Sequence, residues 1–256
     1  MDNTQLGHVN VTFENSIITI SFYHPANNSL PSNLLSQLVA AITAAGEDPS
    51  VSAVVLKSEG EKVFCAGASF DELAAIDTIE TGKKFFSGFA NVINAMRKCP
   101  KFVVVRAHER AIGGGVGLCA AADYCMATTQ STIRLSELAV GIGPFVIGPV
   151  VERKMGLSAY SEMSINATEW RTPEWAKEKG LFNEVFENTT LLDDYLRRFT
   201  TQLTQYNPEA MRELKRVFWQ NTGDWDELLA ERAAISGRLA LSDFTKNAIA
   251  AFKQKG

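Results

Sequence analysis

The segment RAIGGGVGLCAAAD, residues 110–123, contains four glycines within positions 113–117, directly before an apolar run. A strand rich in β-branched residues, 101–107, precedes it, and the composition after the glycines is that of a short helix. The segment therefore predicts a strand, a glycine loop and a helix that begins near Gly114. Such glycines either let backbone N–H groups face a ligand or only permit close packing, and the pattern alone leaves both readings open.

A second glycine-containing loop follows another apolar strand. Residues 52–58, SAVVLKS, lead into a loop that ends in FCAGASFDEL, residues 64–73. One N–H group from each loop, converging on a single carbonyl oxygen, would form an oxyanion hole. A nucleotide-phosphate site is the weaker alternative, because GGGVG lacks both the GxGxxG spacing and the lysine and hydroxyl residue of a P-loop.

A third candidate is the acid in LSELAVGIGP, residues 135–144. Glu137 lies among apolar residues, and desolvation there would raise the pKa of its carboxyl toward the range that suits proton transfer. The alternative is a helix cap or an ion-pair partner of Arg134. The neighbouring acids Asp71 and Glu72 indicate a solvated helix start rather than a catalytic pair.

The order of elements along the 256 residues indicates an α/β fold. Strands and helices alternate over the first two thirds, whereas the last third is helical throughout. We therefore expect a core over residues 1–190 and a helical region over residues 191–256. The apolar positions of the C-terminal helices are compatible with closure over their own core and with packing on another subunit.

Composition excludes several classes of function. The net charge of −4 and the absence of a large basic cluster argue against nucleic-acid binding. No apolar run is long enough to span a membrane, and the N-terminus does not resemble a secretory signal. The four cysteines show no CxxC spacing, so we expect reduced thiols, no metal site and a cytoplasmic location.

Taken in order, these segments resemble the crotonase superfamily, the enoyl-CoA hydratases and isomerases. The resemblance extends from FYHPANNSL near the start, through the two glycine loops and LSELAVGIGP, to AAFKQK at the end. It implies a spiral of repeated ββα units followed by a helical C-terminal trimerisation region. It also implies a homotrimer or a homohexamer.

The resemblance further implies an acyl-CoA thioester as substrate and no separate cofactor, because coenzyme A arrives as part of the substrate. Carried over by position, the oxyanion-hole donors would be the backbone N–H groups of Ala68 and Gly114. Gly67 and Gly113 next to them are expected in the substrate site. These two loops would then hold a thioester oxygen rather than a phosphate.

The same resemblance suggests two contacts to coenzyme A. Ala66 would offer its backbone to the adenine end, and Lys255 would reach the CoA phosphates of a neighbouring subunit. The loop carries Ser69 and Asp71 where many relatives have Asp and Lys, so a favourable contact near the phosphates is expected to be missing.

Hydratases of the superfamily commonly use two glutamates, and this chain matches one of them. Glu137 fits the first, whereas Gly117 occupies the position of the second and is expected at the substrate site. A single carboxylate suits double-bond migration, yet GGGVGL is similar to a bacterial branch of methylglutaconyl-CoA hydratases that also has glycine there. We therefore expect hydration of a short or branched 2-enoyl-CoA, in fatty acid or branched-chain amino acid breakdown. The alternatives are a Δ3,Δ2-enoyl-CoA isomerase and a non-catalytic acyl-CoA-binding protein.

The superfamily builds its acyl pocket largely from the helix around residues 79–91 and the region after Pro144. In this chain those segments supply four phenylalanines, Phe85, Phe86, Phe89 and Phe145. If these rings face inward they favour a short acyl chain, although core packing explains them equally well.

Overall fold

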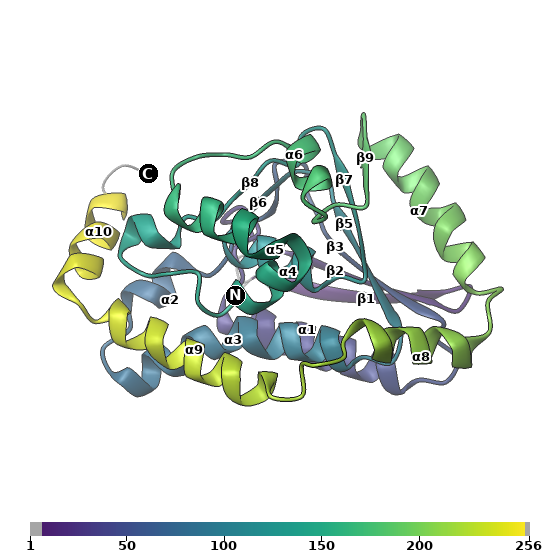
Figure 1. Cartoon of the computed structure of the whole chain (residues 1–256), viewed down its shortest axis with the longest axis horizontal. Coiled ribbons are helices and arrows are strands. Elements are labelled where there is room, and N and C mark those ends of the chain that lie inside the picture. The colour runs from purple at the N-terminus through teal and green to yellow at the C-terminus, as the bar shows by residue number, and fades with distance from the viewer. Residues whose placement is uncertain (1–6, 254–256) are drawn as a thin grey trace.

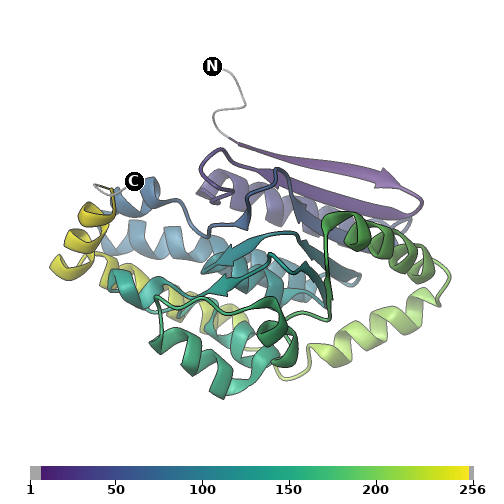
Figure 2. The same cartoon turned by 90° about the horizontal axis from the view of Figure 1, so that it is seen from above.

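The computed structural model describes the backbone of residues 7–253, in which two β-sheets are surrounded by helices (Figure 1). The large sheet has the order β1 (His8–Glu14), β2 (Ile17–Tyr23), β3 (Ala53–Ser58), β5 (Phe102–Ala107), β7 (Tyr124–Thr128) and β9 (Glu184–Phe186). The small sheet has the order β4 (Val63–Cys65), β6 (Arg110–Ile112) and β8 (Ile133–Arg134). Only β1 runs antiparallel to its neighbour, and Figure 2 shows the β1–β2 hairpin at one edge of the large sheet.

From β3 onward, successive strands alternate between the two sheets, which produces the predicted spiral. β3 and β4 precede α2 (Phe70–Ala74) and α3 (Ile79–Lys98), and β5 and β6 precede α4 (Gly114–Ala121). β7 and β8 then lead into the short 3-10 helix η2 (Glu137–Val140) and helix α5 (Gly148–Ile165). The expected α/β class and the repeated ββα units are confirmed.

The central strands are buried on both faces, as their β-branched sequences predict. Val54 and Val105 belong to a core shared with α1 (Ser32–Glu47), α3 and α4. Val55 and Val104 belong to a second core on the opposite face, shared with α7 (Thr189–Leu203) and α8 (Pro208–Phe218). Because successive side chains of a strand point to opposite faces, one strand supplies both cores.

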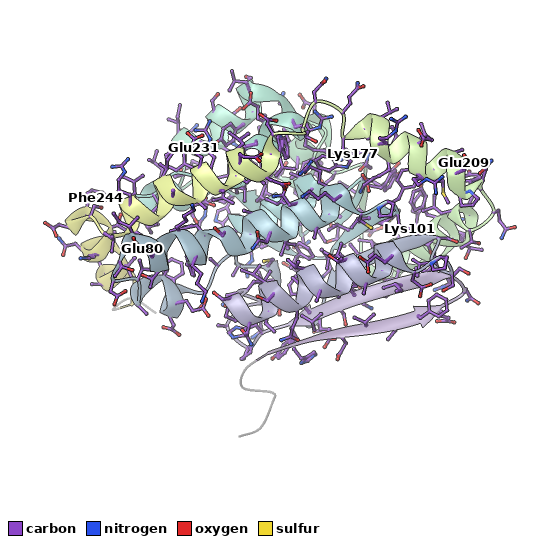
Figure 3. The ribbon with its side chains drawn as sticks, turned by 90° about the horizontal axis from the view of Figure 1, so that it is seen from below. Glu80, Lys101, Lys177, Glu209, Glu231 and Phe244 are labelled. Atoms are coloured by element: carbon purple, nitrogen blue, oxygen red, sulfur yellow. The ribbon has the colours of Figure 1, made fainter. Side chains whose placement is uncertain are left out.

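Helix α3 and helix α9 (Trp225–Ala240) run side by side, as Figure 3 shows from below. Their backbones approach so closely that a Cβ atom on Gly82 would lie 2.8 Å from the Cα of Gly237. Only glycine at both positions allows this contact. Helix α3 begins at a capping box formed by Thr78 and Thr81.

The C-terminal helices pack on the chain to which they belong. Helices α7 and α8 cover one face of the large sheet, α9 lies on α3, and α10 (Asp243–Lys253) contacts η2 and α2. In Figure 1, α10 lies next to α2 at the end of the molecule opposite α7 and α8. Closure over their own core is therefore the arrangement in this structure. The division of the chain at residue 190 stays a prediction, as does trimerisation.

One helix boundary differs from the sequence-based prediction. The apolar residues of FVIGPVVERKMG, residues 145–156, predict a helix with an internal Gly148-Pro149, but α5 begins at Gly148, so the proline lies in its first turn. Proline is favoured there because its missing N–H would have no helical acceptor. The remaining helix of this region is α6 (Pro173–Glu178). Within residues 7–253, no helix is both long and apolar enough to cross a membrane.

Candidate active site

An inner cavity lies where the two glycine loops meet α3, η2 and α9. The empty space within the cavity and at its mouth, which is open to solvent, is about 740 Å³. Six of the site residues predicted from sequence line it, namely Ala66, Gly67, Ala68, Gly113, Gly114 and Glu137. The structure therefore brings both loops and the acid to one place.

The two loops touch at Gly67 and Gly114. A Cβ atom on Gly67 would lie 3.4 Å from the amide nitrogen of Gly114 and 3.0 Å from the carbonyl oxygen of Ile112. The backbone of Gly67 has a φ of +86°, which favours glycine, and its carbonyl accepts a hydrogen bond of 2.8 Å from the Leu30 amide. The first loop is thus held against the second by its own backbone.

Two amides at this junction remain available as donors. Within the part of the chain that the structure describes, neither the N–H of Ala68 nor that of Gly114 donates a hydrogen bond. Gly114 is the first residue of α4, where an amide has no acceptor inside the helix. Gly113, with a φ of +52°, makes the turn into the helix, and its amide donates to the carbonyl of Arg134 at 2.9 Å.

The carboxyl group of Glu137 lies against the second loop. A Cβ atom on Gly113 would lie 2.8 Å from Oε1 of Glu137, so the carboxyl rests on the α-carbon of this glycine. Oε2 is buried and has no hydrogen-bond partner among the described residues. Burial raises the pKa of Glu137 to about 7, against the opposing effects of its own amide and of Arg134.

Arg134 does not neutralise this carboxyl by direct contact. The ion pairs among the described residues do not include Arg134, whose guanidinium lies 4.4 Å from the centre of the Trp170 ring. Its Nε is buried without a hydrogen-bond partner. The ion pair considered as an alternative role for Glu137 is therefore not formed.

Helix α10 supports the segment that carries Glu137. Gly141 ends η2 with a φ of +83°, and a Cβ atom there would lie 2.5 Å from side-chain atoms of both Phe244 and Thr245. The amide of Ile142 donates to the carbonyl of Glu137 at 3.0 Å. Figure 3 labels Phe244 at the α10 end of the molecule. Packing of α10 thus fixes the loop on which Glu137 lies.

Gly117 lies beside the inner cavity but is not among its lining residues. A Cβ atom on Gly117 would lie 2.5 Å from Cγ2 and 3.0 Å from Cβ of Ile147. Ile147 itself lines the cavity and is buried. The isoleucine therefore fills the space that a side chain at Gly117 would need.

An outer groove continues from the inner cavity past Ala66 and Ala68. Its walls include His24, Arg134 and, from α10, Ala248 and Ala251. Burial lowers the pKa of His24, so this histidine is largely neutral near pH 7. Lys255, predicted to reach the CoA phosphates, lies outside the described residues.

The acids of α2 differ in role from the sequence-based prediction. Both carboxylate oxygens of Glu72 accept from the Ser32 amide, at 3.1 and 2.9 Å, and Oε2 also accepts from the Ser32 hydroxyl at 2.7 Å. Glu72 therefore ties α2 to the start of α1 instead of facing solvent alone. Within residues 7–253, no group of three or more His, Cys, Asp or Glu side chains is arranged to hold a metal ion.

Ser236 was not anticipated as a lining residue from the sequence, and it reaches the cavity from α9. Ser236 directly precedes Gly237. A pair of small residues indicates that two helices pack closely, but it does not show which helix is the neighbour. Ile147 lies in the region after Pro144 that the resemblance placed at the acyl pocket, but its contact with Gly117 was not anticipated. The position of Ile147 relative to Gly117 depends on how α4 and α5 pack.

Known proteins resemble this chain in sequence and in fold. The family model described as enoyl-CoA hydratase/isomerase matches residues 12–255. The chain is 27% identical to a short-chain-enoyl-CoA hydratase of Clostridium acetobutylicum, over 98% of this chain and 96% of that protein. It is 30% identical to a mitochondrial methylglutaconyl-CoA hydratase of Mus musculus, over 89% of this chain and 74% of that protein. The crystal structure of an enoyl-CoA hydratase from Bacillus halodurans superposes with a TM-score of 0.86 at 20% identity, covering 95% of this chain and 99% of that one, which supports the fold alone.

Proposed function

Because this chain belongs to the enoyl-CoA hydratase/isomerase family, we propose that it hydrates a short or branched 2-enoyl-CoA, with Glu137 as its acid and base. The relatives at 27% and 30% identity are named as hydratases, which supports hydration as the reaction. The substrate would enter through the outer groove and place its acyl group in the inner cavity.

In this proposal the thioester carbonyl oxygen accepts hydrogen bonds from the amides of Ala68 and Gly114. These donors are fixed before substrate arrives, so little reorganisation is needed when negative charge develops on the oxygen. The dipole of α4, which begins at Gly114, adds to the stabilisation. Removal of one such donor typically slows catalysis by about 100- to 1000-fold.

Glu137 would carry out both proton transfers of the addition. Its carboxylate removes a proton from water while the water oxygen bonds to the β-carbon and the π electrons move onto the thioester oxygen. The resulting carboxylic acid then returns that proton to the α-carbon, and the thioester carbonyl re-forms. One water is added in total, and Glu137 ends the cycle as a carboxylate.

The observation that carries this proposal is the state of the Glu137 carboxyl. It is buried at the junction of the two loops, Oε2 has no partner, and burial raises its pKa to about 7. A group with a pKa near the working pH both accepts and donates a proton readily. A protein that only bound acyl-CoA would gain nothing from an unpaired buried acid, which costs stability.

We expect the coenzyme A portion to lie in the outer groove, with Ala66 as a backbone contact and Lys255 toward the phosphates. Assembly as a homotrimer or homohexamer stays a prediction of the same kind. No additional cofactor takes part in the proposed chemistry.

A second candidate is isomerisation of a 3-enoyl-CoA, and the packing of Gly117 against Ile147 favours it. Without a carboxylate at residue 117, Glu137 is the single proton-transfer group proposed for this site. One carboxylate suffices to take a proton from the α-carbon and return it to the γ-carbon.

Product identification distinguishes the two reactions. The protein is incubated with crotonyl-CoA and, separately, with 3-hexenoyl-CoA, and the products are separated and weighed by mass spectrometry. Hydration predicts a product heavier by one water from crotonyl-CoA. A change in double-bond position with no gain of mass from 3-hexenoyl-CoA, and no reaction of crotonyl-CoA, would instead identify an isomerase.

A further inference from the structure

The inner cavity is mostly apolar, and the polar side chains on its described lining are Glu137, Ser136 and Ser236. Its wall includes four phenylalanines, Phe85, Phe86 and Phe89 from α3 and Phe145 before α5, and the ring of Phe89 packs against Gly114 of the second glycine loop. Helix α9 adds a single described residue, Ser236, which is 1% exposed and whose hydroxyl donates to the carbonyl of Arg232 at 3.3 Å. The phenylalanines thus line the cavity, which is the arrangement that favours a short acyl chain.

Cations are missing from this wall. Among the lining residues within 7–253, none of those around the inner cavity is a lysine, an arginine or a histidine. Arg134 lines the outer groove instead, where its guanidinium is stacked on Trp170. Among the described residues, a negatively charged acyl group would therefore find no counter-charge inside the cavity.

We propose, on the basis of the function proposed above, that this enzyme accepts only acyl groups without a charge and rejects those that carry a second carboxylate. The apolar cavity wall imposes this selection, and Ser236 is the polar residue that α9 contributes to it. The acyl group of methylglutaconyl-CoA carries such a second carboxylate, so the proposal predicts that this thioester is a poor substrate.

Two physical effects exclude the second carboxylate. Moving a carboxylate from water into an apolar cavity is costly unless a cation or several donors compensate. Glu137 must also be ionised to remove a proton from water, and a second negative charge a few ångströms away opposes its ionisation. The penalty therefore affects both binding and the chemical step.

Matched substrates test this selection directly. Glutaconyl-CoA is crotonyl-CoA with one methyl hydrogen replaced by a carboxylate, and 3-methylglutaconyl-CoA bears the same relation to 3-methylcrotonyl-CoA. We expect kcat/KM for hydration to be lower by at least about 100-fold for the charged member of each pair. 2-Hexenoyl-CoA, which is uncharged and slightly longer than the glutaconyl group, controls for size.

The outcomes separate the two proposals. Equal or faster hydration of the charged members would overturn the selection and leave the hydratase proposal standing. Rejection of the charged members together with 2-hexenoyl-CoA would also overturn it, because size alone would then explain the result. Hydration of none of these thioesters would contradict the proposed function itself.

A substitution at Ser236 provides a second test. Ser236→Lys places an ammonium group on the cavity wall, and Ser236→Met adds a side chain of similar length without charge. We expect the ratio of glutaconyl-CoA to crotonyl-CoA hydration to be at least about tenfold higher in the lysine variant than in the methionine variant. Equal ratios in two folded variants would show that charge at this wall does not control selection.

Discussion

Two buried carboxyl groups in this protein have opposite surroundings. Asp123, between α4 and β7, accepts from the Val103 amide at 2.7 Å and the Trp219 indole at 3.0 Å, and it is ion-paired with Lys215. The side chains of Asp123 and Lys215 are only 4% and 3% exposed. Glu137 has one carboxyl oxygen without any partner in the described part of the chain.

This difference identifies the carboxyl group that stabilises the fold. The partners of Asp123 come from a strand and from the end of α8, so this ion pair fastens the helical region to the sheet. Among the described residues, the carboxyl of Glu137 forms no ion pair, and it faces a cavity instead. A buried acid without partners costs stability, and its retention is explained by a role in proton transfer.

The largest effect is expected for Glu137→Gln. The amide keeps the size of the side chain but cannot remove a proton, so kcat for crotonyl-CoA hydration should fall by about 100- to 10,000-fold. The melting temperature should not fall, because no ion pair is lost. Glu213→Gln, which breaks the exposed ion pair with Arg216, is the matched control and should retain activity. A destabilised variant at residue 137 that kept its specific activity would indicate that Glu137 stabilises the fold and does not transfer protons.

The opposite pattern is expected for Asp123→Asn. Loss of the carboxylate leaves the buried ammonium of Lys215 without its counter-charge, which should lower the free energy of unfolding by about 3 to 5 kcal/mol. Urea denaturation followed by circular dichroism measures this change. A loss below about 1 kcal/mol would mean that Asp123 is not the fastening point inferred here.

A smaller effect concerns the pH dependence of stability. The folded state raises the pKa of Glu137 from 4.5 to about 7, so between these values the folded protein binds the proton more tightly than the unfolded chain. This group therefore makes stability fall as pH rises from about 4.5 to 7, by up to about 3 kcal/mol in total. Glu137→Gln should remove this contribution and be more stable than the parent above pH 7. Parallel stability curves for the two proteins would contradict it.

The smallest effect is expected at Gly117, which tests why the site has a single acid. Gly117→Ala places a methyl group against Ile147 and should destabilise the fold by about 1 to 3 kcal/mol. Ile147→Ala in the same chain removes Cγ2, the atom nearest to that methyl group, so Gly117→Ala should cost less stability in this background than in the parent. Additive losses in the double variant would show that Ile147 does not occupy this space.

The sequence predicted the loops and helices of the site better than the contacts between them. The glycine loops, the alternation of strands and helices along the chain and the helix start at Gly114 follow from local patterns of hydrophobicity and turn residues, and the structure agrees with them. The contacts of Gly117 with Ile147 and of Gly141 with Phe244 depend on how helices pack, which no local pattern encodes. The role of Glu72 as a tie to Ser32 likewise joins residues 40 positions apart.

The central claim is that Glu137 alone transfers the protons, and the pH dependence of crotonyl-CoA hydration tests it most directly. The claim predicts that kcat/KM rises about tenfold per pH unit on the acid side and levels off near pH 7, as the carboxyl ionises. Glu137→Gln should abolish this rise along with most of the activity. A parent profile that stays flat through pH 7, or a glutamine variant with the same profile and rate as the parent, would contradict the claim.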